Sequence, residues 1–267
     1  MSAADPVLGG FRRVAGRWPR SCTIDSDSRA VKVSIIIPVY NERNLLAQVL
    51  ERVLAAPLPE GCGREVIVVD DGSTDGTPDI VARFATRPEF RACRLETNHG
   101  KGSAIRLGIA QATGDFILVQ DGDLEYDPRD YVRLLEPLVT RRAGVVYGSR
   151  FPAGARGMKF ANRLANRLLT LTANVLYQAR ITDEATAYKA FRADILKSLP
   201  LTCRRFEFCP EVTAKVRRLG HRIVEIPIGY NARGVLDGKK IRWHDGVVAL
   251  WTLIKCRFAP LAVKPGA

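Results

Sequence analysis

Apolar and polar residues alternate in blocks along the chain, and the blocks predict strands and helices in turn. Val31–Val39 is a nearly continuous β-branched run, the pattern of a strand that is buried on both faces. Further runs predict strands over 65–69, 92–96, 116–120 and 144–148, and the segments between them predict helices over 44–54, 77–84, 101–112 and 128–140. Strands that alternate with helices at this spacing indicate βαβ units and a mostly parallel sheet.

The second half of the chain has a different pattern. It predicts a long helix over 158–177, a short strand over 186–191, a helix over 210–219, a strand over 222–228 and a helix over 245–257. Residues 1–30 are rich in Arg, Ser, Asp and Gly without periodicity, so we expect a flexible leader. One α/β domain over 31–258 and a short tail over 259–267 complete the predicted organisation.

Composition narrows the class of protein. A chain of 267 residues with 46% hydrophobic and 26% charged residues is typical of a soluble globular enzyme. The net charge of +13 favours anionic partners, which are nucleic acid, anionic lipid headgroups or phosphorylated substrates. The six cysteines lack metal-ligand spacing, and no run approaches the roughly 18 apolar residues of a membrane span. We therefore expect a soluble or peripheral protein with reduced thiols.

Three carboxylates follow the strand over 116–120 at alternate positions. Asp121, Asp123 and Glu125 repel one another unless a cation offsets their charge. Oxygen ligands on a short turn suit Mg²⁺ or Mn²⁺, which typically bridge to the phosphates of a substrate. The competing interpretation is a solvated acidic turn that leads into the helix at Pro128.

Polar segments punctuated by glycine follow the earlier strands as well. They are Pro-Val-Tyr-Asn-Glu over 38–42, Asp-Asp-Gly-Ser-Thr-Asp-Gly-Thr over 70–77 and Asn-His-Gly-Lys-Gly-Ser over 98–103. In open α/β sheets ligands bind beyond the carboxyl ends of the strands. No G-x-G-x-x-G motif follows the first strand and no P-loop occurs. A metal-bridged diphosphate, with its nucleoside held by the first two loops, therefore fits better than a dinucleotide.

These ordered motifs resemble the family 2 glycosyltransferases of the GT-A fold, and more narrowly the branch that transfers mannose to dolichyl or polyprenyl phosphate. The resemblance extends over roughly residues 33 to 257 and includes the segments 148–150, 182–191, 206–208, 225–231 and 238–241. It implies a mostly parallel, Rossmann-like nucleotide-binding sheet flanked by helices, with a C-terminal amphipathic helix. The chain departs from the pattern at 234–236, where relatives tend to carry Thr, an aromatic residue and an acid.

The resemblance also implies a donor site. Its members would be Pro38, Tyr40, Glu42, Asp71, Lys101, Asp121, Arg233 and Lys240. The first three would wall the base and ribose, and Asp71 would hydrogen-bond the base. Asp121 and Asp123 would bind the metal, with Glu125 as a third ligand. Arg233 and Lys240 flank a glycine-containing loop that would close over the donor diphosphate.

The acceptor side is predicted from the chemistry of phosphate. A phosphate monoester is anionic at neutral pH, so it needs cationic clamps and no general base. Arg150, at the end of the 144–148 strand, is the favoured clamp. Arg163 and Arg167, one turn apart on the 158–177 helix, are second candidates, although exposed helix arginines are often merely solvated. Asp183 would position the sugar or acceptor, or act as the base for a hydroxyl acceptor, and joins Asp123 and Arg150 as a catalytic candidate.

We therefore expect a metal-dependent, inverting transfer of a hexose, of mannose or glucose type, from a nucleotide-sugar to a polyprenyl or dolichyl phosphate. GDP-mannose is the favoured donor and a UDP-hexose is the other candidate. An alternative keeps this donor chemistry and uses a sugar or small-molecule hydroxyl as acceptor. A basic nucleic-acid-binding module is a remote alternative, and no RNA- or DNA-binding motif supports it.

The last predicted helix has the pattern of a membrane-surface helix. Basic residues accompany an apolar stripe that consists of Val248, Trp251, Leu253, Ile254 and Phe258. Packing of this stripe on the domain is the competing interpretation. A lipid-phosphate acceptor would bring the protein to an anionic membrane surface. The expected location is therefore the cytoplasm, peripheral at the cytoplasmic face of the membrane.

Overall fold

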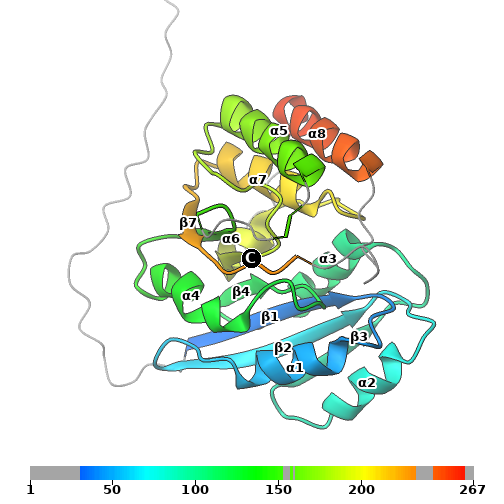
Figure 1. Cartoon of the computed structure of the whole chain (residues 1–267). Helices are drawn as coiled ribbons and strands as arrows, with labels where there is room; N and C mark the ends of the chain where they lie inside the picture. Colours follow the sequence, from blue (N-terminus) through cyan, green and yellow to red (C-terminus); the bar gives the residue numbers. More distant parts are fainter. Residues whose placement is uncertain (1–30, 153–156, 159, 233–242, 262–267) are drawn as a thin grey trace, which may run out of the picture.

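A mixed sheet forms the centre of the fold, and helices cover both of its faces (Figure 1). The structure, a computed structural model, describes residues 31–152, 157–158, 160–232 and 243–261. Within this part of the chain the sheet has seven strands in the order β3-β2-β1-β4-β6-β5-β7. They are β1 (Val31–Val39), β2 (Cys62–Asp70), β3 (Phe90–Arg94), β4 (Phe116–Val119), β5 (Val145–Ser149), β6 (Lys189–Arg192) and β7 (Val224–Pro227). The predicted α/β class is confirmed.

Strand β6 runs antiparallel to both of its neighbours, β4 and β5, whereas the other paired strands are parallel. Its first residue, Lys189, pairs with Val119 and Tyr147 near the carboxyl ends of β4 and β5. The segment 181–188 that leads into β6 therefore lies at the same edge of the sheet as the loops that follow the parallel strands. This reversal brings Asp183 to the predicted ligand edge.

The helices that pack directly on the sheet divide between its two faces. Those of one face are α1 (Leu46–Ala55), α2 (Thr77–Phe84) and α4 (Tyr131–Val139), and those of the other are α3 (Lys101–Gln111), α6 (Ala193–Ser198) and α7 (Phe208–Arg218). Alternate side chains of β1 pack on opposite faces of the sheet. Ile35 and Ile37 belong to the core cluster on one face, and Ile36 belongs to the cluster on the other. Burial on both faces explains why this strand is a nearly continuous apolar run.

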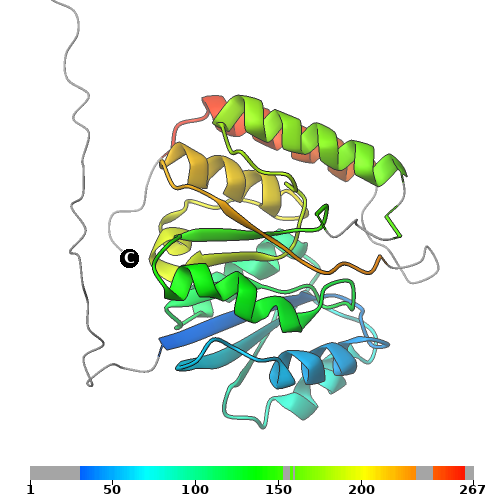
Figure 2. The same ribbon diagram turned by 60° about the vertical axis from the view of Figure 1, so that its left-hand side comes forward.

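Helices α5 (Phe160–Tyr177) and α8 (Trp243–Phe258) form an additional layer outside α7, where they lie side by side (Figures 1 and 2). A small apolar cluster that includes Ala173, Ala214 and Leu253 joins the three helices. Within the described part of the chain, no helix is long and apolar enough to cross a membrane.

The observed bounds differ from the predicted ones by up to three residues at several elements. The helix predicted over 128–140 begins as a 3₁₀ turn, η1 (Pro128–Asp130), before α4. The predicted third strand starts two residues earlier, at Phe90. Helix α6 was not predicted, because it is only six residues long and follows β6 without an intervening loop. The leader over 1–30 lies outside the described residues.

One close contact fixes the position of α3 on the sheet. A Cβ atom added to Gly108 of α3 would clash with the side chain of Ile36 on β1. Ile36 is fully buried at the centre of the sheet and cannot move away. The absence of a side chain at residue 108 therefore allows the helix and the strand to approach closely.

We expect Gly108→Ala to lower the free energy of unfolding by about 1–3 kcal/mol, because overpacking outweighs the better helix propensity of Ala. Gly246→Ala is the matched control, since a Cβ atom at that position of α8 would meet nothing within 4 Å. The control should raise the free energy of unfolding by up to about 1 kcal/mol. Urea denaturation measures both variants, and a Gly108→Ala protein as stable as the wild type would contradict the packing described.

Candidate active site

The loops that follow β1 and β2 are locked together by hydrogen bonds. The backbone N–H of Asn41 donates to Oγ of Ser73 at 2.9 Å, and the N–H of Thr74 donates to Oδ1 of Asn41 at 2.9 Å. The N–H of Glu42 donates to Oγ1 of Thr77 at the start of α2 at 2.9 Å. These bonds hold the segment 38–42, the predicted wall of the nucleoside site, against the loop that follows β2.

Asp71 joins the same edge to the loop that precedes α3. Its side chain is buried, and its two oxygens accept the N–H groups of His99 at 2.8 Å and Gly100 at 2.7 Å. Burial raises the pKa of this carboxyl, and the two N–H groups oppose the rise. Gly100 has a φ of 95° and leaves no room for a side chain against the backbone of Arg204. Asp71 thus shapes the loop, and its predicted bond to the base stays a prediction.

Lys101 and Asp121 form an ion pair across the carboxyl edge of the sheet. Nζ of Lys101, in the first turn of α3, lies 2.5 Å from Oδ1 of Asp121 after β4. Burial would lower the pKa of Lys101, but the carboxylate of Asp121 outweighs it and raises that pKa. Oδ1 of Asp121 is nevertheless buried without a hydrogen bond of good geometry. A carboxylate oxygen has two lone pairs, so this oxygen can bind another cation beside the ammonium group of Lys101.

The other two predicted metal ligands have partners of their own. Oδ1 of Asp123 accepts the N–H of Glu125 at 3.0 Å, and Oε2 of Glu125 accepts the hydroxyl of Tyr230 at 2.9 Å. Among the residues that the structure describes, no three His, Cys, Asp or Glu side chains form a group that could hold a metal ion. Asp121, Asp123 and Glu125 therefore do not form the expected three-carboxylate cluster. The incompletely satisfied oxygen of Asp121 fits a cation bound through one or two carboxylates and the oxygens of a substrate.

Gln120 anchors the loop that carries these carboxylates. It is fully buried, and its Oε1 accepts the hydroxyls of Tyr131 and Tyr188, each at 2.7 Å. Its Nε2 donates to the backbone oxygen of Asp121 at 2.9 Å. Sequence reasoning placed Gln120 at the end of a strand and assigned it no role, although a polar residue that closes an apolar run was the available signal.

Arg150 and Asp183 form a buried ion pair at the end of β5. The carboxylate of Asp183 is fully buried. It accepts hydrogen bonds from Nε and Nη2 of Arg150, both at 2.7 Å, and from the backbone N–H of Arg150 at 3.0 Å. The guanidinium also lies over the ring of Tyr230, 5.1 Å from its centroid. The two predicted catalytic residues are thus brought together, and much of the donor capacity of Arg150 is directed at Asp183.

The loop that contains Asp183 is held by side chains from α5 and β7. Asn166, Thr170 and Asn174, which follow one another at intervals of four on α5, bond to the backbone of residues 185, 184 and 181 respectively. Nδ2 of Asn166 also donates to Asp183 at 3.0 Å. Glu225 of β7 accepts the N–H groups of residues 182 and 183. Sequence reasoning missed this set, since the bonds join residues far apart in the chain.

The remaining predicted site residues fall into three groups. Pro38, Tyr40 and Glu42 are partly buried at the end of β1, as a wall for a ligand requires. Arg163 and Arg167 are exposed on α5, close in sequence to Asn166, and the structure leaves their predicted acceptor role as a prediction. Arg233 and Lys240, with the departure at 234–236, lie outside the described residues.

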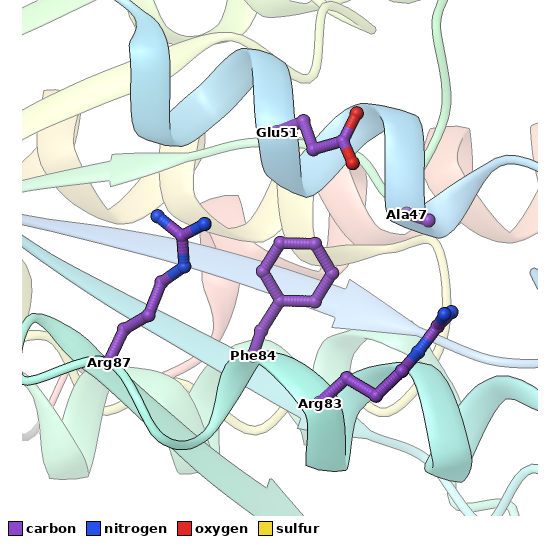
Figure 3. A pocket seen from close by; sticks show the side chains of 5 residues that line it. All are labelled: Ala47, Glu51, Arg83, Phe84 and Arg87. Carbon is purple, nitrogen blue, oxygen red and sulfur yellow. The ribbon is translucent and has the colours of Figure 1, made fainter.

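Two surface hollows lie between helices. One, of about 220 Å³, is lined by Ala47 and Glu51 of α1, by Arg83 and Phe84 of α2 and by Arg87, which follows α2 (Figure 3). The other, of about 580 Å³, lies between α3 and the region of α6. The chemistry-bearing residues of the carboxyl edge line neither hollow, so the site is identified by its polar contacts and not by cavity volume.

Comparison with known proteins adds independent observations. Residues 34–199 match the family model described as Glycosyl transferase family 2. The chain is 31% identical over 249 residues to "Undecaprenyl-phosphate mannosyltransferase" of Micrococcus luteus. The matched region covers 85% of this chain and 99% of that relative. It is 32% identical to "Undecaprenyl-phosphate 4-deoxy-4-formamido-L-arabinose transferase" of Edwardsiella ictaluri, over 78% of this chain. This chain spans 63% of that relative and 62% of its counterpart in Sodalis glossinidius.

A solved structure shows the same fold. Glucosyl-3-phosphoglycerate synthase from Mycobacterium tuberculosis, in complex with Mn²⁺, uridine-diphosphate and phosphoglyceric acid, superposes with a TM-score of 0.67 at 21% identity. The superposition covers 86% of this chain and 80% of that chain. The expected GT-A type of fold and the resemblance to polyprenyl-phosphate sugar transferases are both confirmed.

The buried pair predicts a large effect on stability. Arg150→Met leaves the carboxylate of Asp183 buried without its counter-charge, so we expect a loss of about 3–5 kcal/mol in the free energy of unfolding. Adding Asp183→Asn removes that charge and should restore part of the loss. Urea denaturation of both single variants and the double variant forms a double-mutant cycle.

The matched control breaks a surface pair. Arg142 lies 2.6 Å from Glu136, and both side chains are more than half exposed. Arg142→Met should change the free energy of unfolding by less than about 1 kcal/mol. Equal effects of Arg150→Met and Arg142→Met would show that the Arg150–Asp183 contact is not a buried charge pair.

Proposed function

The chain belongs to glycosyl transferase family 2, and on that premise we propose that it moves a hexose from a nucleotide-sugar to a polyprenyl phosphate with the help of a divalent metal. The names of its relatives support the lipid-phosphate acceptor, since the sugars differ among them and the polyprenyl phosphate recurs. The relative that the chain covers almost entirely is a mannosyltransferase, which supports mannose as the sugar. GDP-mannose is therefore the favoured donor, and a UDP-hexose is the other candidate.

The observation that carries the donor side is the buried oxygen of Asp121 beside Lys101. Asp121 and Asp123 would hold Mg²⁺ or Mn²⁺, which when bound offsets the charge of the donor diphosphate. Lys101 would supply a further positive charge there, as would Arg233 and Lys240. The interlocked segment 38–42 would wall the nucleoside, and the loop shaped by Asp71 would close its other side. Oε2 of Glu125 accepts the hydroxyl of Tyr230, so the other oxygen of this carboxylate would serve as the third ligand.

The acceptor side rests on Arg150. Its guanidinium is held in one orientation by Asp183, so it offers a positioned positive charge instead of a mobile one. Asp183 then acts as a positioning residue, because both oxygens of its carboxylate already accept hydrogen bonds from the guanidinium of Arg150. A phosphate monoester needs no such acceptor, since it is already anionic. The pair therefore supports a phosphate acceptor over a hydroxyl acceptor.

The proposed reaction is an in-line displacement. An oxygen of the acceptor phosphate attacks the anomeric carbon, and the bond from that carbon to the diphosphate oxygen breaks. The electron pair of this bond leaves with the nucleoside diphosphate, and the anomeric configuration inverts. Arg150 holds the attacking anion while Lys101 stabilises the departing one, so two negative groups are held together in a productive geometry.

Asp123→Asn should reduce turnover by at least about a thousandfold and leave the free energy of unfolding nearly unchanged, because it removes one charge from the metal site. Asp127→Asn is the matched control, since Asp127 lies in the same loop and pairs with the exposed Arg129. That variant should keep most of its activity. Release of nucleoside diphosphate in the presence of Mn²⁺ gives the rate. Full activity of Asp123→Asn, or of the wild type in excess chelator, contradicts the metal role.

Donor binding is measured separately by thermal shift. GDP-mannose with Mn²⁺ at about a hundredfold excess over its Kd should raise the melting temperature by roughly 5–10 °C, by mass action on the folded state. Chelator should abolish the shift. If UDP-hexoses raise the melting temperature and GDP-mannose does not, the choice of nucleotide is wrong. A shift given by duplex DNA and by no nucleotide-sugar would instead favour the nucleic-acid-binding alternative.

A further inference from the structure

Helices α5 and α8 expose two apolar stripes next to each other. The side chains of these stripes are Phe160, Leu164, Leu168, Leu171 and Val175 on α5, and Trp243, Val247, Val248, Trp251, Ile254 and Phe258 on α8. Within the described part of the chain, every large apolar side chain that is highly exposed belongs to one of these two helices. We call the surface formed by these eleven side chains the α5/α8 face. A contiguous apolar face of this kind marks an interaction site.

The stripe on α8 differs from the one expected from the sequence. Leu253, which was expected to belong to it, is fully buried with Ala249 and Cys256 against α5 and α7. Trp243 at one end of α8 is 83% exposed and Phe258 at the other end is 80% exposed, so the outer stripe runs the full length of the helix. Packing on the domain is thus confirmed for the inner side of this helix, and the membrane role of its outer stripe stays a prediction.

The charges on the two helices identify the partner. Helix α5 contains no carboxylate, and the one carboxylate of α8, Asp245, is buried. The exposed charged residues on the two helices are Arg163, Arg167, Lys255 and Arg257, all of them cations. At about 100° per residue, Lys255 and Arg257 lie on opposite sides of Trp251, about 40° and about 120° away from it around the helix. A symmetric contact between two copies through this face would bring cations of one copy near cations of the other, and they would repel one another.

We propose that the α5/α8 face docks the protein on an anionic lipid surface, with both helices lying in the plane of the headgroups. Apolar stripes flanked by cations are the features of interfacial helices, and Trp and Phe favour that depth. The α5 stripe adds its own apolar contact to that of α8. The docking proposal rests on the proposed function, because docking gives the protein access to a lipid acceptor that resides in the membrane.

The geometry of α5 connects this face to the reaction centre. Asn166 on its inner side donates to Asp183, while Leu164 and Leu168 point outward from the same turns. The docking face and the Arg150–Asp183 pair thus lie on opposite sides of one helix, whose diameter with side chains is about 10–12 Å. Docking through this face would hold the site at the depth where the phosphate of a membrane lipid lies.

Sedimentation with lipid vesicles tests the proposal without any turnover. The full chain should bind vesicles of phosphatidylcholine mixed with phosphatidylglycerol, should bind phosphatidylcholine alone much more weakly, and should be released as salt rises. Leu171→Ser on α5 and Trp251→Ser on α8, which are both 60% exposed in the wild type, should each weaken binding by about tenfold. Retained binding by Leu171→Ser would overturn the assignment of α5.

Two double variants test whether vesicle binding depends on the cations of the α5/α8 face or only on the net charge of the protein. Lys255→Gln with Arg257→Gln should weaken binding by roughly thirtyfold, because each basic residue near such a surface contributes about a factor of five. Arg83→Gln with Arg106→Gln removes two exposed arginines from α2 and α3, outside the α5/α8 face, and should have little effect. Equal losses from the two double variants would show attraction by net charge alone and would overturn the proposal. Urea denaturation checks that all four proteins fold.

The remaining outcomes separate the docking face from the proposed function. A chain that dimerises in solution, becomes monomeric on Leu171→Ser and does not bind vesicles would show that copies of the chain cover the face, and the docking proposal would fail. Transfer to a detergent-solubilised lipid phosphate would still stand in that case. Conversely, the chain could bind anionic vesicles through both helices and yet transfer no sugar to any lipid phosphate. That result would support the docking face and contradict the proposed function.

Discussion

The buried carboxylate of Asp183 is the constraint on which the reaction centre depends. It accepts four hydrogen bonds, three from Arg150 and one from Asn166. A charge buried this completely is tolerated only when it is paired and hydrogen-bonded. The end of β5, the 181–186 loop and α5 are therefore held in one arrangement. β7 joins them through Glu225. The antiparallel direction of β6 is what delivers Asp183 to this edge of the sheet.

The donor edge is built by a different kind of interaction. Backbone N–H groups of one loop donate to side-chain oxygens of the next, as Asn41 does to Ser73 and Gly100 does to Asp71. Such contacts fix the loops, and the ion pair of Lys101 and Asp121 lies across the same edge. A rigid polar edge that contains one incompletely satisfied carboxylate oxygen suits a ligand that brings its own cation and phosphates.

Local patterns predicted the parallel half of the fold well and the tertiary features poorly. The β-branched run over 31–39 and the pattern over 77–84 predicted the bounds of β1 and α2, because both signals are local. The direction of β6 depends on the strands it pairs with, so the hydrophobic pattern of its own segment could not predict it. The strand-end carboxylates and Arg150 were found from their positions, whereas the Arg150–Asp183 bond joins residues 33 apart. Amphipathic periodicity likewise does not reveal which apolar stripe is buried, as Leu253 and Trp251 of α8 show.

Product analysis tests the central claim most directly. The protein is incubated with Mn²⁺, GDP-mannose labelled in the sugar, and polyprenyl phosphate in detergent, and the label is then partitioned between butanol and water. Our account predicts label in the butanol phase as an acid-labile sugar phosphodiester, and none when the phosphate is replaced by the free polyprenol, because the acceptor site is built for an anion. Equal transfer to polyprenol, or transfer confined to water-soluble hydroxyl acceptors, would contradict it.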